Sequence, residues 1–94
     1  RAYNDTVRDS IAYEGLKKYV FTTSYIVELT KLFTEESIRL DFAKSAYTRV
    51  VDPENYFQLE FLFLEEENIK ALNQHMEKKA KAGEIITNEF QGLF

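Results

Sequence analysis

Six side chains near the middle of the chain have the chemistry to bind an anion or an aromatic group. Guanidinium and ammonium groups pair with carboxylates or phosphates, and tyrosine rings combine an apolar face with a polar edge. The candidate binding residues are Arg39, Lys44, Tyr47, Arg49, Asp52 and Tyr56. In the interpretation that we favour, one of the cations pairs with Asp52 or with a helix-end carbonyl and locks the corner at Asp52-Pro53. In the other, the group forms a small anionic or aromatic-lined docking patch.

Residues for metal binding and nucleophilic catalysis are scarce. His75 is the only histidine and the chain has no cysteine, whereas a zinc site needs three or four clustered ligands. A serine hydrolase would have to place His75 beside a serine and an acid, and no serine lies in the strand–turn–helix elbow of such enzymes. We therefore predict no catalytic residue, no metal, no cofactor and no enzymatic activity, and interpret His75 as a surface residue.

The charged clusters fit helix ends better than ligand sites. The acids at 35–36 and 65–67 lack the alternating, glycine-bearing loop of a calcium site, and acids in a first turn face the positive end of the helix dipole. The lysines within residues 78–81 suit a helix C-terminus for the corresponding reason. Because the net charge is −4, nucleic-acid binding is not expected, since it requires a positive face.

The spacing of apolar residues predicts an all-α fold. Three glycines and one proline are too few for turn-rich strands, and no apolar run reaches the roughly 20 residues of a membrane span, so we expect no membrane insertion. The predicted helices run from Asp5 to Val20, from Thr23 or Ser24 to Phe33, from Thr34 to Val50–Val51, from Pro53 to Phe63, and from Glu65 to about Ala82, with Gly83 closing the last.

The dipeptide Asp52-Pro53 is the clearest break in the chain. The residue before a proline is pushed out of the helical region, and proline at a first helical position loses no hydrogen bond. The residues expected to face the core are Ile26, Leu29, Leu32, Phe33, Ile38, Phe42, Ala46, Val50, Tyr56, Leu59, Phe63, Ile69, Leu72, Met76 and Ala80, with Phe57 and Leu62 beside them.

An internal repeat with an offset of 30 residues supports this reading. The segments at 29–36 and 59–66 share two leucines, one phenylalanine and two glutamates at equivalent positions. Each copy, about 24–50 and 54–82, reads as a helix, a tight corner centred on Phe33 or Phe63, and a second helix. Packing the copies together would bury both apolar stripes. We predict one domain over 1–94, a compact bundle of about five helices with two related hairpins and an N-terminal helix.

The two ends of the chain carry separate predictions. The tail at 84–94 contains Phe90, Leu93 and Phe94, which are too apolar to stay in water. We expect them to fold back on the bundle or to dock on a neighbouring chain, which makes a homo-oligomer through the tail possible. Because the sequence opens with Arg1 rather than Met, we expect a fragment or a processed product.

The central part of the chain, about 22–76, resembles a bacterial family known only as a domain of unknown function. The residues that carry the resemblance are Phe33, Arg39-Leu40, Ala43-Lys44, Tyr47, Val51-Asp52-Pro53 and Asn55-Tyr56. The chain departs from the family at Leu64, where a serine or threonine cap is usual before the last helix. The resemblance implies an exported, helical, non-catalytic module in the periplasm or outside the cell, and it supplies no catalytic residue.

The sequence therefore predicts a helical domain whose function is to bind another molecule. The first hypothesis is a protein-interaction or scaffold module of an exported bacterial protein, with a protein or peptide as its partner. The alternative is a small-ligand or peptide-binding domain that uses a cleft between the hairpins lined by Tyr47, Arg49 and Tyr56. A hydrolase is the least favoured hypothesis, because the single His75 would have to serve it.

Overall fold

Helices make up most of the described chain, which in this computed structural model comprises residues 14–86. A short helical stretch at residues 14–18 comes first. The elements that follow are α2 (Thr23–Thr30), α3 (Glu36–Ala46), the 3₁₀ helices η1 (Tyr47–Arg49) and η2 (Pro53–Leu62), and α4 (Glu66–Lys81). The predicted all-α class is confirmed.

The predicted N-terminal helix and C-terminal tail are described only in part. The first helix ends at Lys18 rather than at Val20. Its predicted start at Asp5 lies outside the described residues, as do residues 87–94 of the tail with Phe90, Leu93 and Phe94.

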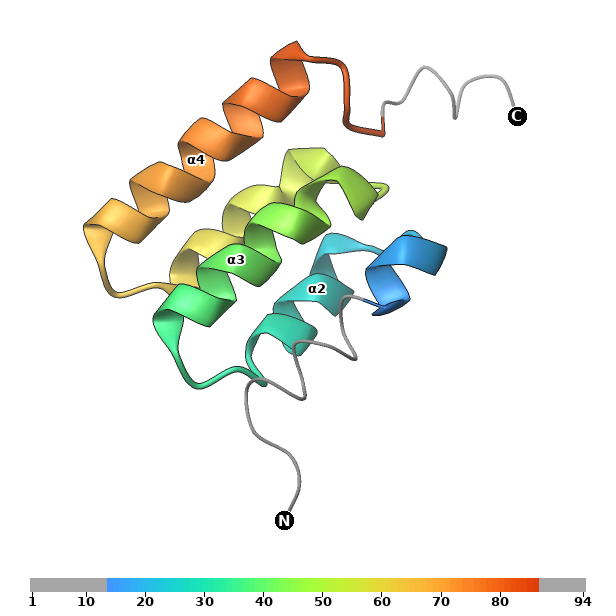
Figure 1. The fold of residues 1–94 in the computed structure, drawn as a ribbon. Helices are drawn as coiled ribbons and strands as arrows, with labels where there is room; N and C mark the ends of the chain where they lie inside the picture. Colours follow the sequence, from blue (N-terminus) through green and yellow to red (C-terminus); the bar gives the residue numbers. More distant parts are fainter. Residues whose placement is uncertain (1–13, 87–94) are drawn as a thin grey trace.

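The chain reverses direction between its longer helices (Figure 1). Helix α3 packs against both α2 and α4, and α2 packs against η2. The two corners at residues 31–35 and 63–65 therefore lie at one end of the bundle (Figure 1). At the other end, the Phe21 amide donates to the Arg49 carbonyl and the Val51 amide donates to the Phe21 carbonyl, both at 2.8 Å. These two hydrogen bonds join the segment before α2 to the residues around the end of η1.

The helices of the two predicted repeat copies begin in the same register. Helix α2 begins at Thr23 and η2 at Pro53, while α3 begins at Glu36 and α4 at Glu66, so each pair is offset by 30 residues. The first helices of the copies pack together, as do the second. This arrangement fits two related hairpins, although gene duplication itself stays a prediction.

The core is formed by side chains from every helix of the described chain. Both corner phenylalanines are inside, with Phe33 1% and Phe63 5% exposed. Phe33 packs on Phe42 with ring centroids 5.3 Å apart. The buried apolar residues are Leu16, Ile26, Phe33, Phe42, Ala43, Ala46, Tyr47, Val50, Tyr56, Leu59, Phe63 and Leu72. Most of the predicted core positions are therefore confirmed.

Helix η2 is a 3₁₀ helix, where the sequence pattern led us to expect an ordinary helical stripe. Its inward residues Tyr56, Leu59 and Leu62 are spaced by three, which stacks them on one face when the helix has three residues per turn. Tyr56 and Leu59 are fully buried and Leu62 is partly buried against the core. Phe57 is rotated off that face and is 53% exposed, which corrects its predicted place beside the core.

Other predicted core residues are displaced where a helix ends. Leu32 is 51% exposed because α2 ends at Thr30, so helical spacing no longer sets its direction. Ala80, in the last turn of α4, is also exposed.

The helix starts differ from prediction by one or two residues. Thr22, rather than Thr23 or Ser24, caps α2, since its hydroxyl accepts a hydrogen bond from the Tyr25 amide at 3.3 Å. The Thr23 hydroxyl instead donates a hydrogen bond to Asp52, at its carbonyl and its Oδ1. Helix α3 begins at Glu36 with the extended residue Glu35 at its N-cap position, one residue after the predicted cap Thr34.

Gly83 closes α4 as predicted. It adopts a φ of 74°, a conformation that glycine takes without a steric penalty. Its amide donates to the Ala80 carbonyl at 3.1 Å, and the Glu84 amide donates to the Lys79 carbonyl at 3.0 Å. These two bonds form a Schellman motif, which satisfies carbonyls at the helix end.

Tyr56 supplies a test of the core. Its buried hydroxyl donates to the Ala43 carbonyl at 2.6 Å, so Tyr56→Phe is expected to lower the free energy of unfolding by about 1 kcal/mol through loss of that bond. Tyr25→Phe is the matched control, because Tyr25 is 52% exposed, and should change it by less than about 0.5 kcal/mol. Chemical denaturation measures both; equal effects would contradict the packing described.

Candidate functional site

Arg39 joins the two corners of the fold. Its Nε donates to the Phe33 carbonyl at 2.7 Å, and its Nη1 donates to the Leu62 carbonyl at 3.1 Å. Nη2 also reaches the Lys31 carbonyl at 3.4 Å. A guanidinium offers five donors in a fixed fork, and here the fork holds both hairpins at once. The predicted lock was placed at the Asp52-Pro53 corner, whereas Arg39 bonds to carbonyls at the corners of residues 31–35 and 63–65, at the other end of the bundle.

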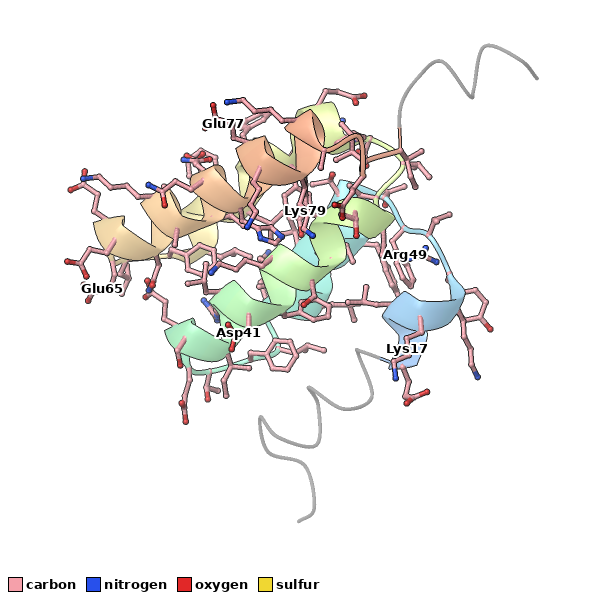
Figure 2. All side chains as sticks on the ribbon, turned by 45° about the horizontal axis from the view of Figure 1, so that its top comes forward. Lys17, Asp41, Arg49, Glu65, Glu77 and Lys79 are labelled. Carbon is pink, nitrogen blue, oxygen red and sulfur yellow. The ribbon has the colours of Figure 1, made fainter. Side chains whose placement is uncertain are left out.

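Arg49 and Asp52 form hydrogen bonds at the end of the bundle opposite the two corners. Arg49 donates through Nε and Nη2 to the Tyr19 carbonyl, at 3.1 and 2.8 Å, and Figure 2 shows its side chain near the segment that follows residues 14–18. Asp52 Oδ1 accepts from the Thr23 amide at 2.7 Å and from the Thr23 hydroxyl at 3.0 Å. Its Oδ2 accepts from Asn55 at 3.0 Å. Asp52 is thus held by Thr23 and Asn55.

The environment of Asp52 sets its charge state. Partial burial acts to raise the pKa of its carboxyl, but the hydrogen bonds from Asn55 and Thr23 outweigh burial and leave the pKa below its ordinary value. The ionised form is therefore favoured, and it fixes the start of η2 against the start of α2.

The two tyrosines of the predicted patch lie in the core. Tyr47 is 5% and Tyr56 0% exposed, with ring centroids 5.1 Å apart. Burial raises the pKa of both hydroxyls. Lys44 is half-buried. The six predicted residues are therefore divided between the two ends and the interior, and they do not form one exposed patch.

Glu36 is a structural residue that the sequence analysis had placed only in a helix first turn. Its Oε2 accepts from the Leu64 amide at 3.1 Å, the Glu65 amide at 2.8 Å and Asn68 Nδ2 at 2.9 Å. Hydrogen bonds from Asn68 and Glu65 lower the pKa of this carboxyl. A carboxylate from α3 thus binds the start of α4, where Leu64 provides no side-chain cap. The missing cap at Leu64 was the available signal.

His75 is half-buried rather than on the surface. Its Nε2 is buried and has no hydrogen-bond partner among residues 14–86. Burial lowers the pKa of the imidazole, and the charges of Lys79, Lys44 and Lys78 lower it further. In the described chain no serine or acid is hydrogen-bonded to Nε2, so this geometry offers no support for a hydrolase.

Residues 14–86 contain neither a group of metal ligands nor a membrane-spanning helix. In that part of the chain, no three or more His, Cys, Asp or Glu side chains are grouped so that they could hold a metal ion. None of the helices found there is both long enough and apolar enough to cross a membrane.

The outer side of η2 and the following corner carry the two most exposed large apolar residues of the described chain, Phe61 and Leu64. We call Phe57, Phe61 and Leu64 the η2 ridge. Phe61 is 82% exposed and Leu64 is 94% exposed. The spacing of apolar residues did not predict this surface, because it placed Phe57 beside the core and marked Leu64 only as a missing cap. The signal was an excess of apolar residues, since a single face of one helix cannot bury all of those at 56–64.

The chain was compared with known proteins. A family model described as a domain of unknown function, DUF4476, matches residues 8–76. The comparisons with curated proteins and with solved structures found no match.

Arg39 is expected to be the most important charged residue for stability. Arg39→Met leaves the carbonyls of Phe33 and Leu62 without their donor, which should lower the free energy of unfolding by about 1.5–3 kcal/mol. Lys70→Met is the control, because Lys70 is an exposed cation on α4. Denaturant unfolding tests this expectation, and equal losses in both variants would show that the lock is unimportant.

His75 predicts a pH dependence of stability. Since the folded-state pKa is lowered, the unfolded chain binds the proton first as pH falls below about 6.5, so the free energy of unfolding should fall through this window until the folded-state pKa is passed. His75→Gln should remove this component. Unfolding of both proteins at pH 7.5 and pH 5 provides the comparison; parallel pH profiles would contradict the prediction.

Proposed function

We propose that this chain, which belongs to the DUF4476 family of domains of unknown function, is a protein-interaction or scaffold module without catalytic activity. It binds its partner through the η2 ridge. The observation that carries the proposal is the exposure of Phe61 and Leu64, at 82% and 94%. Covering such apolar side chains removes them from water, which is the main driving force of protein association.

The position of the ridge also supports an interaction role. Leu64 lies in the corner at residues 63–65, where Arg39 bonds to the carbonyl of Leu62 and Glu36 to the amide of Leu64. An apolar side chain on a fixed backbone loses less conformational freedom on binding than one on a flexible loop. The ridge is therefore pre-organised for contact.

The setting that we propose is an exported bacterial protein, in the periplasm or outside the cell. Its support is the resemblance carried by the segment from Phe33 to Tyr56. Fractionation of the producing cell, with antibody detection of the chain, tests this part; recovery only with cytoplasmic markers would overturn it.

The alternative, a ligand cleft between the hairpins, has weaker support. Tyr47 and Tyr56 are buried against each other, and the Arg49 guanidinium is engaged with the Tyr19 carbonyl. A ligand would have to displace these contacts to reach the proposed lining.

Site-specific photocrosslinking tests the interaction role. A benzophenone amino acid placed at position 61 or 64 of the intact protein, in the producing cell, is expected to give one discrete protein adduct common to both positions. Because Lys17 and Glu77 are exposed and belong to other helices than η2, the same group at positions 17 and 77 should not give that adduct. Mass spectrometry identifies the partner.

Two results would overturn the proposal. One is the absence of any adduct from positions 61 and 64 when the protein is folded and present at its natural level. The other is the same set of adducts from all four positions, which would show contact without a defined surface.

A further inference from the structure

The segment that carries the η2 ridge is strongly acidic. Residues 50–69 contain six Asp or Glu residues and no Lys, Arg or His. The net charge of the whole chain is only −4, so the remainder is net positive. The acids of this segment are Asp52, Glu54, Glu60, Glu65, Glu66 and Glu67. The most exposed apolar residues and the greatest local excess of negative charge therefore coincide in one stretch of chain.

Several of these acids adjoin the ridge directly. Glu60 precedes Phe61, and Glu65 follows Leu64. Glu65, Glu66 and Glu67 are exposed, and none of them forms an ion pair within residues 14–86. Asp52 differs, because Thr23 and Asn55 hold it at the other end of the bundle. The negative charge beside Phe61 and Leu64 is thus available to a partner.

The lysine cluster at the end of α4 lies away from the ridge, whereas Lys70 is one turn after Glu66 and the Arg39 guanidinium is bonded to the Leu62 carbonyl. Lys78, Lys79 and Lys81 are in the last turn of α4, whereas Glu65 marks its beginning. Figure 2 shows Glu65 at one end of this helix and Lys79 toward the other. A helix of 16 residues is about 24 Å long, which exceeds the Debye length of about 8 Å at physiological salt. The lysines of the last turn therefore do not neutralise the corner.

We infer that the η2 ridge binds a basic amphipathic helix of a partner protein, an inference that rests on the proposed function. Phe61 and Leu64 would insert between apolar side chains along one face of that helix, as ridges pack into grooves. Lysines or arginines flanking the apolar face would pair with Glu60 and Glu65. The acidic rim also opposes association with an anionic surface, so it sets the charge of the partner.

Peptide binding tests the inference. The probe is a fluorescent 18-residue helical peptide with leucines at i, i+3, i+4 and i+7 and lysines elsewhere, and its counterpart carries glutamate at every lysine position. The full chain is titrated against each peptide by anisotropy. The basic peptide should bind, and the acidic peptide should bind at least about tenfold more weakly, which corresponds to 1.4 kcal/mol.

Variants assign the binding to the ridge. Phe61→Ser with Leu64→Ser should weaken binding of the basic peptide by at least about tenfold. Glu60→Gln with Glu65→Gln should weaken it several-fold and reduce its dependence on salt. Tyr25→Ser is the apolar control, since Tyr25 is half-exposed on α2, and Glu77→Gln is the charge control on α4. Both controls should bind like the parent chain, and circular dichroism confirms that each variant is folded.

Each remaining outcome counts against the inference. Equal binding of the acidic and basic peptides, or equal losses in the control variants, would overturn it. Dimerisation through the same residues, seen by sedimentation as loss of dimer in the Phe61→Ser and Leu64→Ser variant, would make a second copy the occupant. Binding to phosphatidylcholine vesicles but not to the peptide would replace a protein partner by a membrane.

The inference and the proposed function fail separately. If the photocrosslinked adduct at position 61 forms equally in the parent protein and in the variant with Glu60→Gln and Glu65→Gln, the ridge is an interaction surface whose partner is not selected by charge. If no adduct forms at positions 61 and 64, the interaction role itself is wrong.

Discussion

The guanidinium of Arg39 is the constraint on which the arrangement of the two hairpins depends. A tight corner between helices leaves carbonyl groups that no helix can satisfy, and this fold has two such corners at one end. Arg39 reaches the carbonyl of Phe33 in the first corner and that of Leu62 in the second. Because Phe33 and Phe63 are buried directly beside these groups, the polar lock and the apolar core fix the same geometry.

Glu36 is the second charged residue that holds the corner between η2 and α4, and it acts as an acceptor where Arg39 acts as a donor. Its carboxylate receives the amides of Leu64 and Glu65 and the side chain of Asn68, so the first turn of α3 serves as the cap for α4. This solution leaves position 64 free of a capping role. A leucine can then occupy it with 94% of its surface exposed, next to Phe61. The Glu36 carboxylate thus stabilises the corner and also allows an exposed leucine at position 64.

Local patterns predicted the helices and most of the core, because apolar spacing and breaks such as Asp52-Pro53 act over a few residues. They did not predict the partners of long side chains, since Arg39 and Glu36 bond to residues 23 to 32 positions away or across a corner. The 3₁₀ form of η2 was also missed, and with it the exposure of Phe57. Burial of Tyr56 was predicted from its spacing, but the hydrogen bond from its hydroxyl to the Ala43 carbonyl was not.

Amide hydrogen exchange at Leu64 and Glu65 tests most directly whether the two hairpins are joined at a fixed corner. We expect both amides to exchange slowly in the parent protein, since each donates to the Glu36 carboxylate, and to lose that protection in Glu36→Ala while the core amides of α3 keep theirs. Exchange of both amides at the rate of an unstructured peptide in the parent protein would contradict the account.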